Sequence, residues 1–230
     1  MSATGNNPAI IEDVARPDPD LVRRLGEFGA ATVCEADPRV RVMDGPAPRY
    51  PGSQVAGAAV TCLNRAGDNL MLHAAMTQCR PGDVLVVAVH PRSSHGMFGD
   101  LLATQAKAVG VVAAVLDSGV RDTAAMRELG FPTWSRTVTV TGTTKLHRGT
   151  VNHPVVCGGV LVEPGDVVVA DDDGVVVVPR AAIADTVAGA TARAEREEAL
   201  RRRYQAGEAS LDVSGLRERL TPTALEGTHA

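Results

Sequence analysis

The fold of this chain is decided by the stretch VLVVAVHPRSSHGMFGDLLATQAKAVGVVAAVLDSGVRD, residues 84–122. It opens with the uninterrupted apolar run 84–89, which indicates a buried strand, and it continues into a helical pattern over 99–109. A second apolar run over 111–116 predicts another strand, and a short helix is expected over 122–129. Continuous apolar strands separated by helices are typical of parallel sheet that is covered on both faces. The stretch therefore predicts an α/β fold.

The chain before this stretch continues the same alternation of helix and strand. Asp18 followed by Pro19 has the form of a helix N-cap with proline in the first turn. Residues 55–62 are expected to form a strand, and Asp68 is expected to cap a helix that ends near Cys79. These elements extend the predicted parallel section towards the N-terminus.

The chain after this stretch changes character. Short β-runs joined by turns predict a mixed or antiparallel section over 136–140, 155–162, 167–170 and 175–178. The acidic stretch 171–174 lies between two valine runs, so it is interpreted as a hairpin turn and not as a metal loop. A long, highly charged helix is expected from Pro179 to about Ala206. We expect a single domain over residues 1–230, with about 1–17 and 218–230 as less ordered tails.

Composition excludes several classes of protein. Hydrophobic residues make up 44% of the 230 residues and the formal net charge is −4, so a nucleic-acid or anionic-membrane partner is not indicated. No run approaches the ~18 apolar residues of a membrane span, and the N-terminal segment has no signal-peptide core. The four cysteines are widely spaced, which favours reduced thiols and a cytoplasmic location. The arginine-rich helix over 193–203 is interpreted as a solvated or intersubunit face.

Three polar residues follow the two central strands. Asp100 begins the helix after the first strand, and Arg121 and Asp122 follow the second. Because parallel strands end at one edge of the sheet, the three residues are expected to meet there, where open α/β folds bind ligands. A carboxylate suits Mg²⁺ or Mn²⁺, an arginine fork suits a carboxylate or enolate oxygen, and helix-start amides over 99–102 suit an anion.

Structural interpretations of the same residues remain open at this point. An aspartate at a helix start is usually a cap, so Asp122 could cap its helix just as Asp100 caps its own. An arginine beside an aspartate is often a surface pair that contributes little. Spacing alone therefore suggests a site without deciding it.

A wider resemblance adds to this pattern. The segments GDNLMLHAAMTQCRPGDVLVV, HGMFGDLLATQAKAVGVVAAVLDSGVRD, FPTWSR and HPVVCGGVLVEPGDVVVADDDGVVVVPR resemble the class II pyruvate aldolases. These are typified by 4-hydroxy-4-methyl-2-oxoglutarate/4-carboxy-4-hydroxy-2-oxoadipate aldolase, and the family includes the regulator of ribonuclease activity A. The resemblance covers about residues 20–217. Its signature, an aspartate followed after twenty residues by Arg-Asp, stands here as Asp100 and Arg121-Asp122.

The resemblance implies a swivelling β/β/α fold in homotrimers or homohexamers whose active sites are shared between subunits. It implies Mg²⁺ or Mn²⁺ at Asp122 and a small 2-oxo acid substrate. The residues implied to contact that substrate are Gly99, Asp100, Leu101, Leu102, Arg121 and, at a site-proximal position, His73. A glutamate of a neighbouring C-terminal helix is implied as well. It falls at Glu197 in an ungapped comparison, with Glu195 and Glu198 as alternatives.

The resemblance predicts a metal-dependent lyase of the EC 4.1.3 type. A 4-hydroxy-2-oxo acid would be cleaved by a retro-aldol reaction to pyruvate and a second oxo acid, with Arg121 stabilising the pyruvate enolate. Decarboxylation of oxaloacetate is expected as a side activity because it passes through the same enolate. A Schiff-base mechanism is the chemical rival, but Lys107 and Lys145 are the only lysines and neither is obviously placed at the site.

Two further functions remain open. The chain could be a non-catalytic regulator that binds a ribonuclease, or it could act on a different 2-oxo acid in a biosynthetic pathway. The second possibility rests on departures from the family pattern at Cys34, Trp134 and Thr137–Thr139, which are expected to reshape the substrate end of the pocket.

Overall fold

The computed structural model describes residues 8–220. Its helices are α1 (Pro19–Phe28), α2 (Ala30–Ala36), α3 (Leu70–Ala75), α4 (Asp100–Ala108), α5 (Thr123–Leu129), α6 (Ile183–Gln205) and α7 (Ser210–Val213), with the 3₁₀-helices η1 (Arg180–Ala182) and η2 (Arg217–Leu220). Its strands are β1 (Arg41–Val42), β2 (Ala47–Pro48), β3 (Val55–Arg65), β4 (Asp83–His90), β5 (Gly96–Phe98), β6 (Ala113–Val120), β7 (Thr133–Val138), β8 (Thr150–Val151), β9 (Val155–Cys157), β10 (Val160–Val162), β11 (Val167–Ala170) and β12 (Val175–Val178).

The strands form one large mixed sheet and a separate hairpin. The order of the large sheet is β1-β12-β11-β3-β4-β6-β7-β2, with β5 on β6 and β8 on β3. Within it β3, β4, β6 and β7 run parallel, whereas β11, β12 and β1 add antiparallel strands beside β3. Strands β9 and β10 make the hairpin. The expected α/β fold class, with a parallel centre and a later mixed section, is confirmed.

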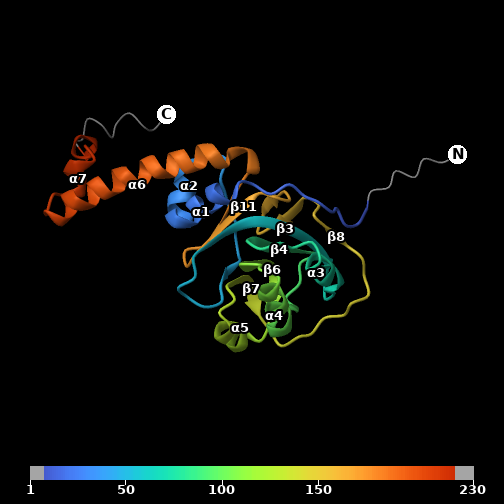
Figure 1. Ribbon diagram of the computed structural model, residues 1–230. Coiled ribbons are helices and arrows are strands. Elements are labelled where there is room, and N and C mark those ends of the chain that lie inside the picture. The colour runs from blue at the N-terminus through green and yellow to red at the C-terminus, as the bar shows by residue number, and fades with distance from the viewer. Residues whose placement is uncertain (1–7, 221–230) are drawn as a thin grey trace, which may run out of the picture. The chain divides into compact units, whose positions relative to one another are not determined.

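Alternate side chains of the parallel strands pack into two different hydrophobic cores, one on each face of the sheet. Leu85 and Val87 of β4 pack with α3, α4 and α5 on one face. Val84 and Val86 pack on the other face against the β9–β10 hairpin and the inner face of β11 and β12. This two-sided burial is why the strand sequences are continuous apolar runs. Figure 1 shows α3, α4 and α5 lying together beside these strands.

Alternate side chains of β11 and β12 also lie in two different cores. Val168 and Val177 face the hairpin core, whereas Val167 and Val176 face a third core that contains Leu25 of α1 and Val33 of α2. The turn that joins these two strands pairs Ala170 with Val175, so the acidic stretch 171–174 is the hairpin turn that the sequence predicts. The expected long helix is α6.

Several expected boundaries are wrong. Strand β3 continues past residue 62 to Arg65, and the run expected over 136–140 is β7, which begins at Thr133 and pairs parallel with β6. The helix expected from Asp68 to Cys79 is α3, which ends at Ala75 because the next amides, of Thr77 and Gln78, bond to carbonyls only three residues back. Strand β6 does not stop at residue 116 but continues through 117–120, because β5 and β7 both pair with its far end.

The expectation that Trp134 shapes the substrate pocket is also wrong. Its indole is fully buried in the core shared with the β9–β10 hairpin, and its Nε1 donates to the Asp171 carbonyl at 2.8 Å. A buried indole needs a partner for its N–H, and the turn after β11 supplies one. Cys34 is half-buried on α2 and packs against the third core.

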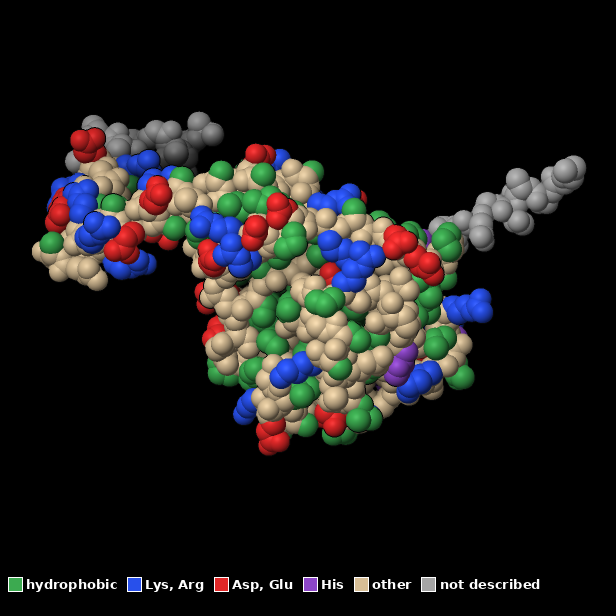
Figure 2. Space-filling model, viewed as in Figure 1, with side chains coloured by type: hydrophobic (Ala, Val, Ile, Leu, Met, Phe, Trp, Pro, Cys, Tyr) green, Lys and Arg blue, Asp and Glu red, His purple; other side chains and the backbone are tan. Residues whose placement is uncertain are grey.

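The chain divides between Ala190 and Thr191 into two compact units. In the second unit, arginines of α6 pair with glutamates of the same helix, as in Arg193–Glu197 and Arg201–Glu198. Figure 2 shows basic and acidic side chains interspersed on the face it displays. This pairing agrees with the interpretation of residues 193–203 as a solvated or intersubunit face.

Three other features of the chain bear on the expectations. All four cysteines are free. Among the described helices, none is long and apolar enough to cross a membrane. Of the tails expected at 1–17 and 218–230, residues 1–7 and 221–230 lie outside the described part, while Ile10 pairs with Val151 and Arg16 with Asp83.

Candidate active site

The pairing of β5 with β6 brings the two halves of the predicted site together. The two strands run parallel with Phe98 opposite Val120, and the Arg121 amide donates to the Phe98 carbonyl at 3.0 Å. The residues that follow the strands therefore leave the sheet side by side. The twenty residues between Asp100 and Arg121 are spanned by α4 and β6, as the spacing predicted.

Gly99 is the point of closest approach between these two chain segments. A Cβ at Gly99 would lie 2.5 Å from Asp122 Oδ2 and 3.0 Å from Arg121 Cγ. A Cβ at Gly96 would lie 3.3 Å from Arg121 Cβ. A side chain at Gly99 would displace the Asp122 carboxylate, and one at Gly96 would require a small shift of Arg121, so both glycines leave room for the site residues.

Asp122 is not a helix cap. It occupies the N-cap position of α5 with φ 55°, a left-handed conformation, and its side chain makes no capping hydrogen bond. Its Oδ2 accepts from Arg121 Nε at 3.1 Å, and both side chains are partly exposed. A left-handed aspartate is uncommon, and such residues cluster at functional sites. The interpretation of Asp122 as a cap is therefore wrong.

Asp100, unlike Asp122, does not occupy the N-cap position of its helix. The N-cap of α4 is Gly99, and Asp100 is the first helical residue. Its Oδ1 accepts from the Leu101 amide at 2.8 Å, and its side chain lies at the mouth of a cavity. A carboxylate in the first turn is favoured by the helix dipole, and one of its two oxygens can still serve a ligand.

The cavity beside Asp100 has a volume of about 250 Å³. All six residues predicted to contact substrate line it: His73, Gly99, Asp100, Leu101, Leu102 and Arg121. The remaining lining comes from residues that the sequence did not single out for this role: Asn69, Gly96, Met97, Gly142, Thr143 and Lys145. The structure therefore brings the predicted residues of one chain together and adds a wall built from residues 142–145.

The expectation that neither lysine is placed at the site is wrong for Lys145. It lies in the segment between β7 and β8 that has almost no regular structure, and it lines the cavity. Lys107, in contrast, lies in the last turn of α4 and donates to the Leu129 carbonyl. The sequence predicted no helix or strand between residues 140 and 155, and irregular connections longer than about 12–15 residues are often functional, so this signal could have pointed to Lys145.

Two residues that line the cavity have buried polar atoms with no partner within the described residues. Asn69 is buried and donates through Nδ2 to the Met97 carbonyl, but its Oδ1 has no hydrogen bond there. His73 Nε2 is likewise buried without a partner. Burial and the nearby charge of Lys145 lower the pKa of His73, so the ring is neutral at pH 7. Unpaired buried polar atoms are costly, which favours a polar ligand in this cavity.

A divalent metal fits the donor set beside the cavity. Within residues 8–220 no group of three or more His, Cys, Asp or Glu side chains is arranged to enclose an ion. Mg²⁺ does not need such a group, because it is commonly held by one or two carboxylates and keeps several waters. Asp122, free of a capping role, could supply the direct oxygen, and Asp100 could hold a water.

Two other predicted residues take different places. Glu197 belongs to the second compact unit, where it pairs with Arg193 at 2.8 Å. His95, in the loop before β5, does not line the cavity; it packs against Gly67, and its Nδ1 lies 2.7 Å from Ser93 Oγ.

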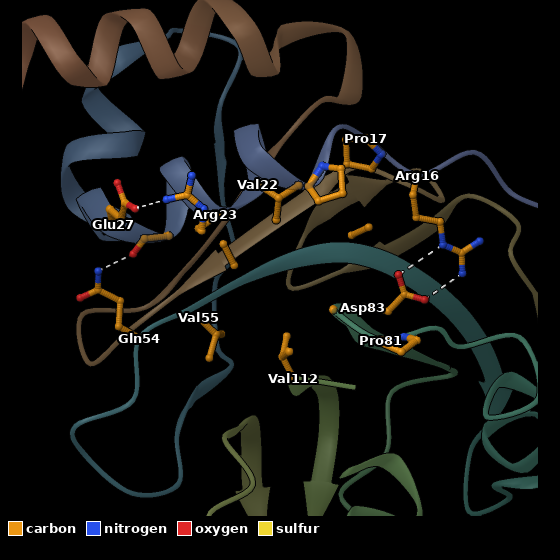
Figure 3. A pocket seen from close by; sticks show the side chains of 15 residues that line it. Arg16, Pro17, Val22, Arg23, Glu27, Gln54, Val55, Pro81, Asp83 and Val112 are labelled. Carbon is orange, nitrogen blue, oxygen red and sulfur yellow. Dashed lines mark hydrogen bonds and ion pairs between the residues drawn. The ribbon is translucent and has the colours of Figure 1, made fainter. Parts of the chain in front are cut away.

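A larger cavity of about 510 Å³ lies at the opposite edge of the parallel strands, between α1 and the starts of β3 and β4. Figure 3 shows Val22, Val55 and Val112 around it, with Arg16 turned to Asp83 and Arg23 turned to Glu27. Each of its charged side chains is already paired, so this cavity offers no free charge to a ligand.

The amino-acid sequence and the fold of the protein both match known proteins. The model of the RraA-like family, Aldolase/RraA, matches residues 30–177. The chain belongs to this family.

Relatives within and around the family carry different names. A protein of Halalkalibacterium halodurans named "Putative 4-hydroxy-4-methyl-2-oxoglutarate aldolase" is 38% identical over 133 residues, which cover 58% of this chain and 63% of that protein. The chain thus matches less than two thirds of the length of the curated relatives.

Solved structures show the same fold. RraAS2 of Streptomyces coelicolor, described as an unusual member of the RNase ES inhibitor RraA family, is 35% identical with a TM-score of 0.73 over 82% of this chain and 99% of that chain. The RNA-processing inhibitor RraA of Thermus thermophilis is 25% identical with a TM-score of 0.60 over 65% and 91%.

Proposed function

We propose that the protein is a divalent-metal-dependent lyase that cleaves a 4-hydroxy-2-oxo acid to pyruvate and a second oxo acid. The observation that carries this proposal is the convergence of Asp100 and Arg121 at one cavity, with the Asp122 carboxylate bound to Arg121 and free of a capping role. The named aldolase relative supports the reaction class. The metal, Mg²⁺ or Mn²⁺, and the substrate are parts of the proposal.

Each residue has a separate task in the proposed reaction. Asp122 would hold the metal, which supplies positive charge that stabilises an enolate when it is bound. Arg121 donates its N–H groups to the 2-oxo oxygen, where negative charge develops as the C3–C4 bond breaks. The first-turn amides of α4, over 99–102, face the C1 carboxylate.

In this proposal, carboxylates hold the water that accepts the substrate proton. The C4 hydroxyl proton passes to a water held by Asp100 and by Glu197 of the partner subunit, and the electron pair of the C3–C4 bond forms the enolate. Protonation of C3 then gives pyruvate. The enolate is shared with oxaloacetate decarboxylation, so we propose that activity as well.

The role of a partner subunit is supported by exposed apolar side chains. Val156 and Leu161 are opposite each other in the β9–β10 hairpin and are 60% and 46% exposed. Val42, which is 58% exposed, lies on β1, whose Arg41 donates to the Leu161 carbonyl. Exposed apolar side chains gathered in this way favour association, and we propose a homotrimer or homohexamer.

A ribonuclease-binding regulator is the second candidate, because the solved relatives include RNA-processing inhibitors. The cavity distinguishes the two functions. A protein-binding surface does not need buried, unpaired polar atoms such as Asn69 Oδ1 and His73 Nε2, which belong to residues that line the cavity.

Pyruvate release tests the proposal. The protein is incubated with oxaloacetate or with 4-hydroxy-4-methyl-2-oxoglutarate, in Mg²⁺ or Mn²⁺ and then with excess chelator. We expect metal-dependent turnover that Asp122→Ala lowers by about 10³-fold, as expected for removal of a main charge-stabilising group. Folded protein without metal-dependent turnover of either substrate would contradict the lyase. Borohydride added with pyruvate should leave activity intact, because trapping at Lys145 would indicate a Schiff base.

A further inference from the structure

The wall of the candidate site that contains Lys145 is attached to the rest of the protein through the turn at Gly67–Asn69. The Thr144 amide donates to the Gly67 carbonyl at 2.8 Å, and the Asn69 amide donates to the Thr144 carbonyl at 3.0 Å. These bonds form an isolated parallel bridge between Asp68 and Thr144. The segment 142–147 is therefore held by residues more than seventy positions earlier in the chain.

Asp68 lies at the centre of this attachment, and its two oxygens serve different elements. Oδ1 accepts from the Leu70 amide at the start of α3, at 3.0 Å. Oδ2 accepts from Thr144 Oγ1 at 2.7 Å, from the Leu146 amide at 2.6 Å and from the His147 amide at 3.2 Å. The Oδ2 donors flank Lys145 on both sides in sequence.

The burial of Asp68 makes this arrangement strong. Asp68 is 1% exposed. Burial raises the pKa of its carboxyl, but the amides of Leu146 and Leu70 and the Thr144 hydroxyl more than offset that effect and hold the pKa well below its usual value. Hydrogen bonds to a buried charged acceptor are stronger than those to a neutral one. The segment is thus fixed by a carboxylate that does not itself line the cavity.

We propose that Asp68 is a positioning residue of the candidate active site, which holds residues 142–147 so that the Lys145 side chain lines the cavity that contains Arg121. This inference rests on the proposed function for its kinetic consequence, but not for the attachment itself. Arg121 and Asp122 are held by β5, β6 and α5, so releasing the segment leaves them in place. Loss of Asp68 therefore weakens substrate binding more than it slows the chemical step.

The substitution Asp68→Asn tests this inference with almost no change in shape. The amide oxygen can still accept from Leu70, but the amide NH₂ would face the Thr144 hydroxyl, the Leu146 and His147 amides and the His147 ring in place of Oδ2. Thr144→Val is a milder second variant that removes only the hydroxyl donor. Asp166→Asn is the matched control, because Asp166 is also buried, at 3% exposed, and accepts from the amides of Glu163 and Arg180 away from the cavity.

The first measurement is trypsin cleavage of the folded protein after Lys145 and Arg148. We expect Asp68→Asn to accelerate cleavage there by about tenfold or more, and Thr144→Val by less, while Asp166→Asn leaves the rate at these two bonds unchanged. If both Asp68→Asn and Thr144→Val remain as protected as the original protein, the attachment is not what fixes the segment and the inference is overturned.

The second measurement is the turnover of oxaloacetate. Asp68→Asn should raise KM about tenfold and change kcat less than about threefold, with both constants unchanged in Asp166→Asn. A released segment with an unchanged KM would overturn the positioning role and leave the lyase intact. An original protein without turnover would contradict the lyase, while the trypsin result would still decide whether Asp68 holds the wall.

Discussion

The two cavities at opposite edges of the parallel strands differ in whether the polar groups of their lining residues are paired, and this difference does not follow from their volumes. The amino-edge cavity is about 510 Å³ and the carboxyl-edge cavity about 250 Å³. In the larger one, Arg16 is paired with Asp83 and Arg23 with Glu27. In the smaller one, Asn69 and His73 have buried polar atoms without a partner among the described residues.

This difference favours the smaller cavity as the ligand site. Folding stability favours pairing every buried polar group, as at the amino edge. Leaving such groups unpaired costs stability, so it is tolerated where a ligand completes them. The smaller cavity also lies at the carboxyl edge of the parallel strands, where open α/β sheets bind ligands. The proposed function therefore belongs to the smaller cavity.

Among the substitutions that test which cavity is the site, Arg121→Lys should have the largest effect on pyruvate release. A lysine keeps the charge but cannot present two parallel N–H groups, so pyruvate release should fall by about 10²-fold. Arg127→Lys on α5 is the control, because Arg127 is exposed and outside the cavity lining. Normal turnover in Arg121→Lys would refute the role of the guanidinium.

Gly99→Ala should have the next largest effect. Its methyl group would lie 2.5 Å from Asp122 Oδ2, so the carboxylate must move, and we expect turnover to fall by at least about tenfold. Gly26→Ala adds the same group to the amino-edge cavity, 3.1 Å from the Ala56 methyl. That control should keep full turnover. Equal activity in the two variants would mean that turnover does not depend on the position of the Asp122 carboxylate beside Gly99.

The pH dependence of stability should reveal His73 at the carboxyl edge. Its pKa is lowered from 6.5 by burial and by Lys145, so the unfolded chain takes up the proton more readily than the folded one. Stability should therefore fall as the pH drops below about 6.5. Urea unfolding at pH 7.5 and 5.5 should show a smaller loss in His73→Asn than in the original protein, and an equal loss would contradict this account.

Arg23→Ala at the amino edge should have the smallest effect. Arg23 is 62% exposed and pairs with Glu27 and Asp20 on its own helix. Such pairs contribute little, so the free energy of unfolding should change by less than about 0.5 kcal/mol. Pyruvate release should not change. A marked loss of turnover would show that the larger cavity takes part in function.

Several features of this protein follow from local sequence. The valine-rich runs predict buried strands because both faces of the sheet are covered, and the alternation of β4 between two cores shows this directly. The twenty residues from Asp100 to Arg121 match a helix and a strand. The place of 121–122 could be predicted because these residues follow β6, whereas 99–102 follow β5, a strand that the sequence did not predict.

Other features were decided only by contacts between distant parts of the chain. The short strand β5 and the end of β6 form because each supplies the other with hydrogen bonds, and neither has a strong local pattern. Trp134 is buried because the Asp171 carbonyl is available for its N–H. Partners that are distant along the chain cannot be inferred from the residues next to a position in the sequence.

The sequence by itself therefore determined the α/β class and indicated Asp100, Arg121 and Asp122 as candidates at the carboxyl edge, because these inferences depend on short-range pattern and on spacing. The tertiary structure alone decided that Asp122 is left-handed and free of a cap, and that Lys145 joins the cavity wall. Asp68 and Leu146 are joined by one hydrogen bond of 2.6 Å across 78 positions. Only folding brings such residues within hydrogen-bonding distance.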